Sequence, residues 1–377
     1  MRIVQVTPFF HPHAGGVESH VRALAREFAR QGHEVTIVTS RYDPTLPTEA
    51  SFEGYRILRS RTWGVVFNTP IDVGTRRIVR RVDADVVHLH YPPPLSSYIA
   101  VGGLTSRHVP VCLTYHCDLY LPVPGGRVLT ALYENLFLRR TLAGVDRVIV
   151  HTRSYATTSA VLRGRNIAII PSSVDVQRFR PDVDGREIRH RLGFDDKRVL
   201  AFTGRLVPHK GVDSLLRAMV GLPPDVALLV IGRGSRLPEL RALARRLNLL
   251  GRVQFASDVS DDELPAYLRA ADIFVFPSQN RLEGFGLAVV EAMAAGLPVV
   301  ITDMPGVREV IEPGVEGVLV EPLIASDLTD RVRELLDDPE RRRKMGERAR
   351  QRAEERYALA TVARSLLNLY EDLRAAG

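Results

Sequence analysis

The stretch that decides the fold lies at residues 273–298 and reads IFVFPSQNRLEGFGLAVVEAMAAGLP. Its apolar start at residues 273–276 is typical of a buried parallel strand, and the Gly, Asn and Ser residues that follow indicate a loop. The apolar run from residue 287 to residue 295 predicts a helix, which Gly296 and Pro298 would end. The order is therefore strand, glycine-containing loop and helix.

The start of this helix predicts a binding site for an anion. The first N–H groups of a helix lack partners within it, and the helix dipole favours negative charge there. Glu283 and Glu291 would repel an anion, so we expect their carboxylates to accept hydrogen bonds from hydroxyl groups on either side of it. Phosphates flanked by hydroxyls describe a nucleotide sugar. The alternative, two solvated carboxylates, is disfavoured for Glu291 because an unpaired charge on an apolar helix is costly.

Short apolar, β-branched runs alternate with helical segments along both halves of the chain, which predicts right-handed βαβ units and parallel sheets covered on both faces. Two such series predict two Rossmann-like domains, residues 1–175 and 176–356, with a hinge near residues 172–182. Ligands bind such sheets beyond the carboxyl ends of the strands. The expected strands cover residues 3–6, 35–39, 86–89, 111–114, 148–151, 167–170, 199–203, 227–231, 253–255, 273–276, 299–301 and 318–320.

Residues 283–291, EGFGLAVVE, resemble the two-glutamate signature of retaining glycosyltransferases of family 4. The resemblance implies the α/β GT-B fold, in which two Rossmann-like domains face each other across a cleft and the last helix, about residues 357–377, packs back on the first domain. It implies a hexosyltransferase that moves a sugar from GDP-mannose or a UDP-hexose to a hydroxyl of a glycan or lipid-linked acceptor. No cofactor and no metal are expected. The donor-binding residues that it implies in this stretch are Glu283, which would also act in catalysis, and Gly284, Phe285, Gly286, Leu287 and Glu291.

Two features of the first half resemble the same family. Gly15 and Gly16 precede a predicted helix at residues 18–31 but do not form the Gly-x-Gly-x-x-Gly dinucleotide pattern. A Gly-Gly turn lets bare backbone approach a phosphate, and the resemblance implies that both residues bind the donor diphosphate. It also implies that His116 contacts the donor sugar and supports catalysis, although a histidine bonded to nearby backbone is an open alternative. The Pro- and Gly-rich segment at residues 120–126 suits contact with an acceptor.

Arg205 and Lys210 lie on the loop after the expected strand at residues 199–203. Two cations there can hold a diphosphate and neutralise the charge that grows on it as it leaves. Only three of the 51 basic residues are lysines, so Lys210 departs from the usual choice of this chain. We predict catalytic and donor-binding roles for both residues, as the resemblance also implies. Gly232 and Val259 follow the next two strands and are expected to face the nucleobase, with a plain turn as the alternative for Gly232.

Length and composition fit a two-domain globular protein. The 377 residues exceed what one core usually holds, and 45% are hydrophobic and 25% charged. No charged-then-apolar signal segment opens the chain, and Glu291, Gly296 and Pro298 interrupt its longest apolar stretch, so a cytoplasmic location is expected. Cys112 and Cys117 would lie on opposite faces of one strand, which argues against a disulfide between them.

The net charge of +7 is concentrated in the first half. Residues 1–175 hold 20 arginines, no lysine and 13 acidic residues, whereas residues 176–377 hold 31 basic and 31 acidic residues. A basic first domain suggests attraction to an anionic membrane surface, as on the inner face of the membrane, and a solvated arginine-rich face is the alternative. No nucleic-acid partner is expected. The densest basic part contains Arg56, Arg59, Arg61, Arg76, Arg77, Arg80 and Arg81.

Other functions could use the same architecture. A nucleotide-sugar epimerase would interconvert the donor without an acceptor, and a non-catalytic nucleotide-sugar-binding protein would keep the phosphate ligands without turnover. A phosphorylase would need a lysine bound to pyridoxal phosphate, and no suitable lysine follows the glutamate motif.

Overall fold

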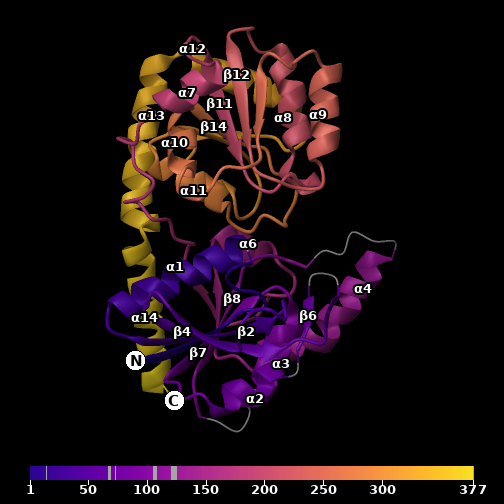
Figure 1. The fold of residues 1–377 in the computed structure, drawn as a ribbon, viewed down its shortest axis with the longest axis vertical. Coiled ribbons are helices and arrows are strands. Elements are labelled where there is room, and N and C mark those ends of the chain that lie inside the picture. Colours follow the sequence, from indigo (N-terminus) through magenta and orange to yellow (C-terminus); the bar gives the residue numbers. More distant parts are fainter. Residues whose placement is uncertain (14, 67–68, 73, 105–107, 120–124, 377) are drawn as a thin grey trace. The chain divides into compact units, whose positions relative to one another are not determined.

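The computed structural model describes residues 1–13, 15–66, 69–72, 74–104, 108–119 and 125–376 (Figure 1). The chain divides into two compact units, which we call unit 1, Met1–Ser172 with Leu359–Gly377, and unit 2, Ser173–Ala358. The first division lies close to the expected boundary after residue 175. Most of the segment at residues 120–126, which we expected to meet an acceptor, lies outside the described residues.

Unit 1 is built on an eight-stranded sheet with the order β10-β9-β8-β7-β1-β2-β4-β3. Every neighbouring pair is parallel except β3 and β4. Its strands are β1 Arg2–Val6, β2 Glu34–Arg41, β3 Glu49–Phe52, β4 Tyr55–Arg61, β7 Val86–Tyr91, β8 Val111–Tyr115, β9 Arg147–Val150 and β10 Ile167–Ile169, and a separate hairpin pairs β5 Gly64–Val66 with β6 Thr69–Ile71. The helical segments are α1 Gly16–Arg30, α2 Gly74–Arg81, α3 Pro94–Leu104, α4 Gly126–Tyr133, the π-helical η1 Glu134–Leu138, α5 Arg139–Ala143, α6 Arg153–Thr158 and α14 Leu359–Ala376.

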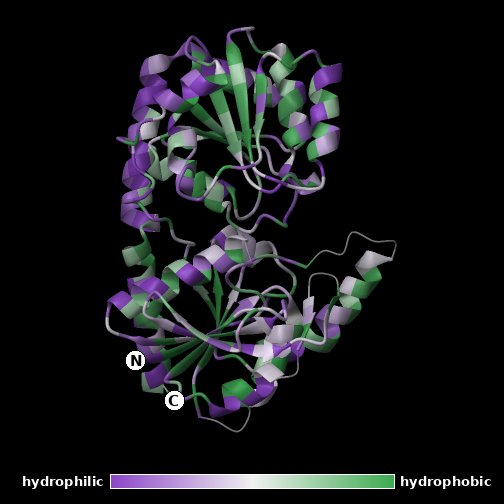
Figure 2. Cartoon of the chain, viewed as in Figure 1, coloured by the Kyte–Doolittle hydropathy of each residue, from purple (hydrophilic) through white to green (hydrophobic). Residues whose placement is uncertain are grey.

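The two faces of this sheet carry separate apolar cores. Alternate strand residues point to opposite faces, so Ile3 and Val86 pack with α1 and α14, whereas Val4 and Val87 pack with the helices on the other face. The C-terminal helix α14 therefore completes the core of unit 1. Figure 2 shows the corresponding pattern, with hydrophobic strands and hydrophilic outer helix surfaces.

The strands β3 and β4 were not expected, because the arginines around residues 56–61 suggested a basic surface. In the structure, Arg59 is buried and donates hydrogen bonds to the carbonyl oxygens of Pro47 at 3.2 Å and His11 at 3.1 Å. Arg56 pairs with Glu49 at 2.6 Å across the β3–β4 hairpin. The interpretation of Arg59 as part of an exposed basic surface is therefore wrong, whereas Arg56, Arg76, Arg77, Arg80 and Arg81 are exposed.

Unit 2 contains a fully parallel six-stranded sheet with the order β13-β12-β11-β14-β15-β16. The order reverses direction between β11 and β14, which is the point where such sheets bind ligands. Its strands are β11 Arg198–Thr203, β12 Val226–Ile231, β13 Val253–Ala256, β14 Ile273–Phe276, β15 Val299–Thr302 and β16 Gly317–Val320, all six of which were expected. In Figure 1, α8 and α9 flank the strands on one side, and α7 and α10 lie on the other.

The helical segments of unit 2 follow its strands and close its core. They are α7 Arg186–Leu192, η2 Pro208–Lys210, α8 Val212–Ala218, η3 Met219–Gly221, α9 Leu237–Arg246, α10 Leu264–Arg269, α11 Leu287–Ala294, η4 Arg308–Val310, α12 Ala325–Asp337, α13 Pro339–Arg352 and the π-helical η5 Ala353–Tyr357. The chain passes between the units after residues 172 and 358, and Val174 and Ala358, next to these crossings, form a parallel bridge.

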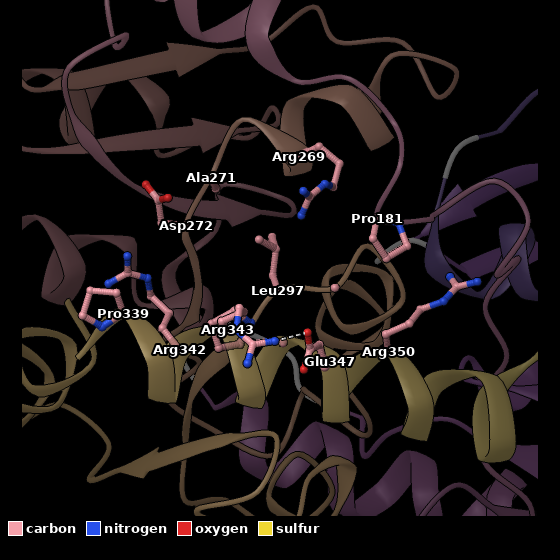
Figure 3. Close-up of a pocket in the computed structure, with 13 residues that line it drawn as sticks. Pro181, Arg269, Ala271, Asp272, Leu297, Pro339, Arg342, Arg343, Glu347 and Arg350 are labelled. Carbon is pink, nitrogen blue, oxygen red and sulfur yellow. Dashed lines mark hydrogen bonds and ion pairs between the residues drawn. The ribbon is translucent and has the colours of Figure 1, made fainter. Parts of the chain in front are cut away.

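Two arginines cap the C-terminal end of α11. Arg350 Nη1 donates to the carbonyl oxygens of Ala294 at 2.7 Å, Val176 at 3.0 Å and Phe179 at 2.6 Å, and Arg269 Nη1 donates to Ala295 at 3.1 Å. Arg269, Arg350 and Leu297 are among the residues that line the pocket in Figure 3, at the amino ends of the strands. The contacts with Ala294 and Ala295 satisfy carbonyl groups that the end of α11 leaves without partners. The contacts with Val176 and Phe179 join this helix end to the segment before α7, so together they fix the helix that starts at the predicted anion site.

We expect Arg350→Ala to lower the free energy of unfolding by about 2–4 kcal/mol, because three partly buried hydrogen bonds to carbonyl groups would be lost. Denaturant unfolding measures the change. Arg348→Ala, on the exposed face of the same helix, is the control and should change stability by less than about 0.5 kcal/mol. Equal effects of the two substitutions would contradict a capping role.

Candidate functional site

The loops at the carboxyl edge of the unit 2 sheet approach one another so closely that only glycine fits. A Cβ atom on Gly211 would lie 2.0 Å from the carbonyl oxygen of Pro277, and one on Gly232 would lie 2.1 Å from that of Gly204. Gly211 and Gly232 also have φ angles of +69° and +134°, which other residues rarely adopt. The loops after β11, β12 and β14 are therefore held together through their backbones.

Lys210 and Glu283 lie on two of these loops and form an ion pair. Each side chain is only 13% exposed, and Lys210 Nζ lies 5.0 Å from the centroid of the Phe276 ring, a favourable cation–π position. The loops are also joined where the Gln279 N–H donates to the His209 carbonyl oxygen at 2.8 Å. The structure thus brings two predicted site residues together, with each neutralising the other, and their roles as donor ligands stay predictions.

The start of α11 lies next to this ion pair. Gly286 is the N-cap with φ +89°, and no side chain caps the helix. A Cβ there would lie 3.2 Å from a side-chain atom of Val289 and 3.3 Å from one of Phe276. Glycine is therefore favoured both by the positive φ angle and by the close packing. Phe285 is buried with its ring 5.7 Å from that of Tyr357, which anchors the predicted phosphate loop in the core of unit 2.

The remaining predicted donor residues of unit 2 surround this point. Gly284 is buried in the same loop, and Leu287, the first residue of α11, is partly buried against the core. Arg205 is exposed on the loop after β11. The Gly232 N–H donates to the Ala256 carbonyl oxygen at 2.9 Å, and Val259 is partly buried on the loop after β13.

Glu291 lies one turn further along α11, and burial raises the pKa of its carboxyl group to about 7. Among nearby charges, Arg178 lowers this pKa and Asp261 raises it. Arg178 is fixed by a hydrogen bond from its guanidinium to the Asp261 carbonyl oxygen. A partly buried carboxyl group with a raised pKa is typical of a functional site, and it suits a group whose ionised form is stabilised only when ligand hydroxyls donate to it.

In unit 1, Gly15 and Gly16 open α1 at the carboxyl end of β1. Gly15 is extended with φ −177°, and Gly16 is already helical, so the pair is not the Gly-Gly turn that we expected. A Cβ on Gly15 would lie 2.2 Å from the Glu18 carboxylate, which pairs with His13 at 2.9 Å. A Cβ on Gly16 would meet nothing within 4 Å. Both glycines therefore leave bare backbone at a helix start, and their diphosphate contacts stay predictions.

His116 follows β8 and is bonded through both ring nitrogens. Its Nε2 lies 3.1 Å from His90 Nδ1, and its Nδ1 lies 3.0 Å from His151 Nε2. Burial, with a smaller contribution from neighbouring histidines, lowers the pKa of His116 and of His90 well below the ordinary value, and burial lowers the pKa of His151 to about 4. These rings are therefore uncharged at neutral pH. The open alternative of a backbone-bonded histidine is wrong for the His116 ring, because its partners are two other histidines.

Sequence reasoning missed the partners of His116. His20 packs edge-on against the rings of His90, His116 and His151 at centroid distances of 6.2, 5.5 and 5.7 Å. The sequence feature that could have predicted this cluster is the position of each histidine near the start of α1 or near the carboxyl end of a strand. Within the described ranges, no three His, Cys, Asp or Glu side chains form a group that could hold a metal ion. Hydrogen bonds join His90, His116 and His151 to one another.

We expect Glu291→Gln to become more stable than the wild type as the pH rises. Ionisation of Glu291 is disfavoured in the folded state, so the wild type loses stability between the unfolded pKa of 4.5 and the folded pKa of about 7, whereas glutamine cannot ionise. The difference in unfolding free energy should grow over this range to at most about 3 kcal/mol. Exposed Glu239→Gln on α9 is the control. A difference independent of pH would contradict the raised pKa.

Comparisons with known proteins agree with this architecture. Residues 14–178 match the family model described as Glycosyltransferase Family 4, and residues 184–352 match Glycosyl transferases group 1. The chain is 30% identical over 385 residues, 98% of each chain, to the GDP-mannose-dependent alpha-(1-6)-phosphatidylinositol monomannoside mannosyltransferase of Mycolicibacterium smegmatis. It is 31% identical over 412 residues, 98% of this chain and 95% of the relative, to the D-inositol 3-phosphate glycosyltransferase of Xylanimonas cellulosilytica.

A solved structure extends this likeness to the fold. Sucrose-phosphate synthase from Thermosynechococcus elongatus superposes with a TM-score of 0.85 at 24% identity, over 100% of both chains. The two Rossmann-like units described above are thus the two domains of the GT-B fold. The chain belongs to the glycosyltransferases of family 4 and is a hexosyltransferase with the GT-B fold.

Proposed function

We propose that this enzyme transfers mannose from GDP-mannose to a hydroxyl of an inositol-containing, lipid-linked acceptor. The assignment of GDP-mannose as the donor is supported by the similarity, over nearly the whole chain, to a relative named as GDP-mannose-dependent. The acceptor class is supported by two relatives whose names specify phosphatidylinositol monomannoside and inositol 3-phosphate. Both acceptors combine an inositol ring with a phosphate ester.

In this proposal the diphosphate of the donor binds at the start of α11, and the Lys210–Glu283 ion pair opens so that each of the two side chains binds the donor. Lys210 turns to the diphosphate, because two negative phosphates attract the ammonium group more strongly than one carboxylate does. Glu283 then accepts hydrogen bonds from sugar hydroxyls, and Glu291 accepts them from the ribose. Arg205 is the second cation for the diphosphate.

The reaction breaks the bond between the anomeric carbon and the diphosphate oxygen and joins that carbon to the acceptor oxygen. The acceptor proton passes to the leaving diphosphate. Family resemblance implies that the new bond forms on the same face of the sugar. Lys210 and Arg205 contribute by neutralising the charge that grows on the diphosphate in the transition state.

The test is a transfer assay with GDP-mannose, GDP-glucose and UDP-glucose, and with vesicles that contain phosphatidylinositol or its mannosides. We expect mannosyl transfer from GDP-mannose to the inositol lipid. Transfer from UDP-glucose but not from GDP-mannose would overturn the proposed donor assignment. Epimerisation of a donor without acceptor, or binding without turnover of any donor, would favour the alternative functions.

We expect Lys210→Ala to lower kcat by about 100-fold or more, because the leaving diphosphate loses a charge partner. Lys344→Ala is the matched control, since it removes an exposed lysine on α13, and it should keep wild-type turnover. Thermal unfolding of both variants separates catalysis from folding. Near-native turnover in Lys210→Ala would remove this residue from the mechanism.

A lipid-linked acceptor requires the enzyme to work at a membrane, and none of the described helices is long and apolar enough to span one. An exposed apolar face on α4 and η1 supports surface binding instead. Val128, Leu129, Leu132 and Leu136 are between 43% and 65% exposed, and their spacing places them on one side of the helix (Figure 2). The opposite side packs inward, where Phe137 meets Tyr98 at a ring distance of 5.3 Å.

Positive charge borders this apolar face. Arg139 and Arg140 are exposed at its C-terminal end, and exposed arginines continue on α2. The β5–β6 hairpin packs on α3, as η1 does, and carries Trp63, which is 75% exposed. Apolar residues with flanking arginines and an exposed tryptophan are the composition of an element that lies in the interface of an anionic bilayer. We therefore propose that α4 and η1 dock on anionic lipid.

We expect Leu132→Asp to weaken binding to vesicles of phosphatidylglycerol and phosphatidylcholine by at least about tenfold, because an apolar contact is replaced by a repelled charge. Val220→Asp, at a similarly exposed apolar position in unit 2, is the control. Vesicle sedimentation measures the affinity. Unchanged binding of Leu132→Asp would exclude this face as the docking element.

A further inference from the structure

A continuous hydrogen-bonded chain runs through His116 inside unit 1. It starts at the Ile170 carbonyl oxygen, 3.1 Å from His151 Nδ1, and passes from His151 Nε2 to His116 Nδ1 at 3.0 Å. It continues from His116 Nε2 to His90 Nδ1 at 3.1 Å and ends with His90 Nε2, 3.0 Å from the side-chain amide of Gln5. Four links thus join three histidines to a carbonyl group and an amide.

The sheet explains why these groups meet. Gln5 on β1 and His88 and His90 on β7 share one face, because residues two apart on a strand point the same way. Gln5 is the register partner of His88, and His90 is that of Thr114. This is the face covered by α1 and α14, where Tyr370 bonds His88 Nδ1 at 2.6 Å. Polar residues therefore replace apolar ones along one line of the core.

Counting protons fixes how the chain is arranged. The Ile170 carbonyl can only accept, so His151 Nδ1 must carry a hydrogen. A neutral His151 then accepts at Nε2, which requires a hydrogen on His116 Nδ1. The same step requires a hydrogen on His90 Nδ1 and leaves His90 Nε2 as an acceptor. Three neutral histidines supply three hydrogens for four links, so the fourth hydrogen must come from Gln5.

The side-chain amide of Gln5 can supply that hydrogen if its nitrogen, not its oxygen, faces His90. The two orientations have the same shape, and hydrogen bonding decides between them. With the oxygen facing His90, the amide nitrogen is buried without a hydrogen-bond partner. The exchanged orientation provides the missing donor and leaves a carbonyl oxygen at that buried position, which is tolerated more often than an orphaned N–H.

We infer that Gln5, His90 and His151 are positioning residues that hold His116 as a neutral imidazole with its proton on Nδ1. The described ionisable groups whose rings face this chain are His20 on α1 and His88 on β7. Both are buried, and burial lowers the pKa of each below the ordinary value. The chain is therefore uncharged along its whole length at neutral pH.

The neutral state of His116 has a consequence for catalysis, and this consequence rests on the proposed function. Positive charge develops on the transferred sugar as the diphosphate leaves, and a cationic imidazolium beside it would oppose that charge. His116 has both ring nitrogens bonded within the protein, so its ring neither gives nor takes a proton in the reaction. It serves as a fixed, uncharged surface.

The tautomers are tested on the unliganded wild-type enzyme, so the result does not depend on donor or acceptor. Long-range ¹H–¹⁵N spectra of histidine-labelled protein at pH 7 identify the protonated nitrogen of each ring. We expect His90, His116 and His151 all to be neutral and protonated at Nδ1. Exposed His190 serves as the internal reference. A proton at Nε2 of His116, or an imidazolium at any of the three positions, would overturn the inference.

Gln5→Glu provides a second test, because an ionised carboxylate cannot donate the fourth hydrogen. We expect this variant to bind one proton more at pH 7 than its sequence predicts, either on the introduced carboxyl group or on the histidine chain, and the spectra distinguish these positions. Gln5→Met removes the donor without adding an acceptor. The three tautomers should persist, because the Ile170 carbonyl oxygen still requires a hydrogen on His151 Nδ1 and so sets the direction of the other bonds. Normal ionisation of the introduced carboxyl group with three neutral histidines would contradict the proton count.

Kinetics then connects the chain to catalysis. If the extra proton lies on the histidines, Gln5→Glu should lose kcat by about tenfold or more with little change in the donor KM, since charge near the reacting carbon affects the transition state most. The loss should shrink as the pH rises and the proton leaves. A pH-independent loss would indicate a purely structural role for Gln5.

Discussion

The constraint on which the site depends is the close approach of backbones at the carboxyl edge of the unit 2 sheet. Gly211 touches Pro277, and Gly232 touches Gly204, at distances that no Cβ atom tolerates. The parallel sheet brings the loop ends to one edge, but the glycines bring them into contact. Lys210 and Glu283, which are 73 residues apart, can therefore share an ion pair at the start of α11. Side-chain chemistry follows from backbone geometry here.

The two units solve the problem of buried polar groups differently. In unit 2, Glu291 is partly buried, and the raised pKa of its carboxyl group means that its ionised form costs stability. In unit 1, both ring nitrogens of His88, His90, His116 and His151 have partners, which are other histidines, Gln5, Thr114, Tyr370 and the Ile170 carbonyl oxygen. The first arrangement is ready for ligand hydroxyls, and the second is closed. The carboxyl group proposed to bind ligand thus lacks hydrogen-bond partners among the described residues of the free protein, whereas the residues that keep a fixed shape already have them.

Much of this could be predicted from the sequence, because apolar periodicity and glycine positions are local signals. All strands of unit 2 and the helix from Leu287 were expected, and so were the residues around the glycine loop. The strand Tyr55–Arg61 was missed because its arginines conceal an alternating pattern, and Arg59 is buried through carbonyl contacts that depend on distant residues. The histidine chain was missed because its links join residues up to 85 positions apart. Local patterns do not encode such pairings.

The C-terminal helix has a consequence for how the protein is made. Residues 359–376 close the face of the unit 1 sheet that holds Gln5 and His88, and Tyr370 bonds His88 directly. During translation, the strands of unit 1 leave the ribosome first, but α14 follows only after all of unit 2. Unit 2 is one continuous segment and can finish folding while that face is covered by α1 but not yet by α14. The first domain to be synthesised is therefore the last to be completed.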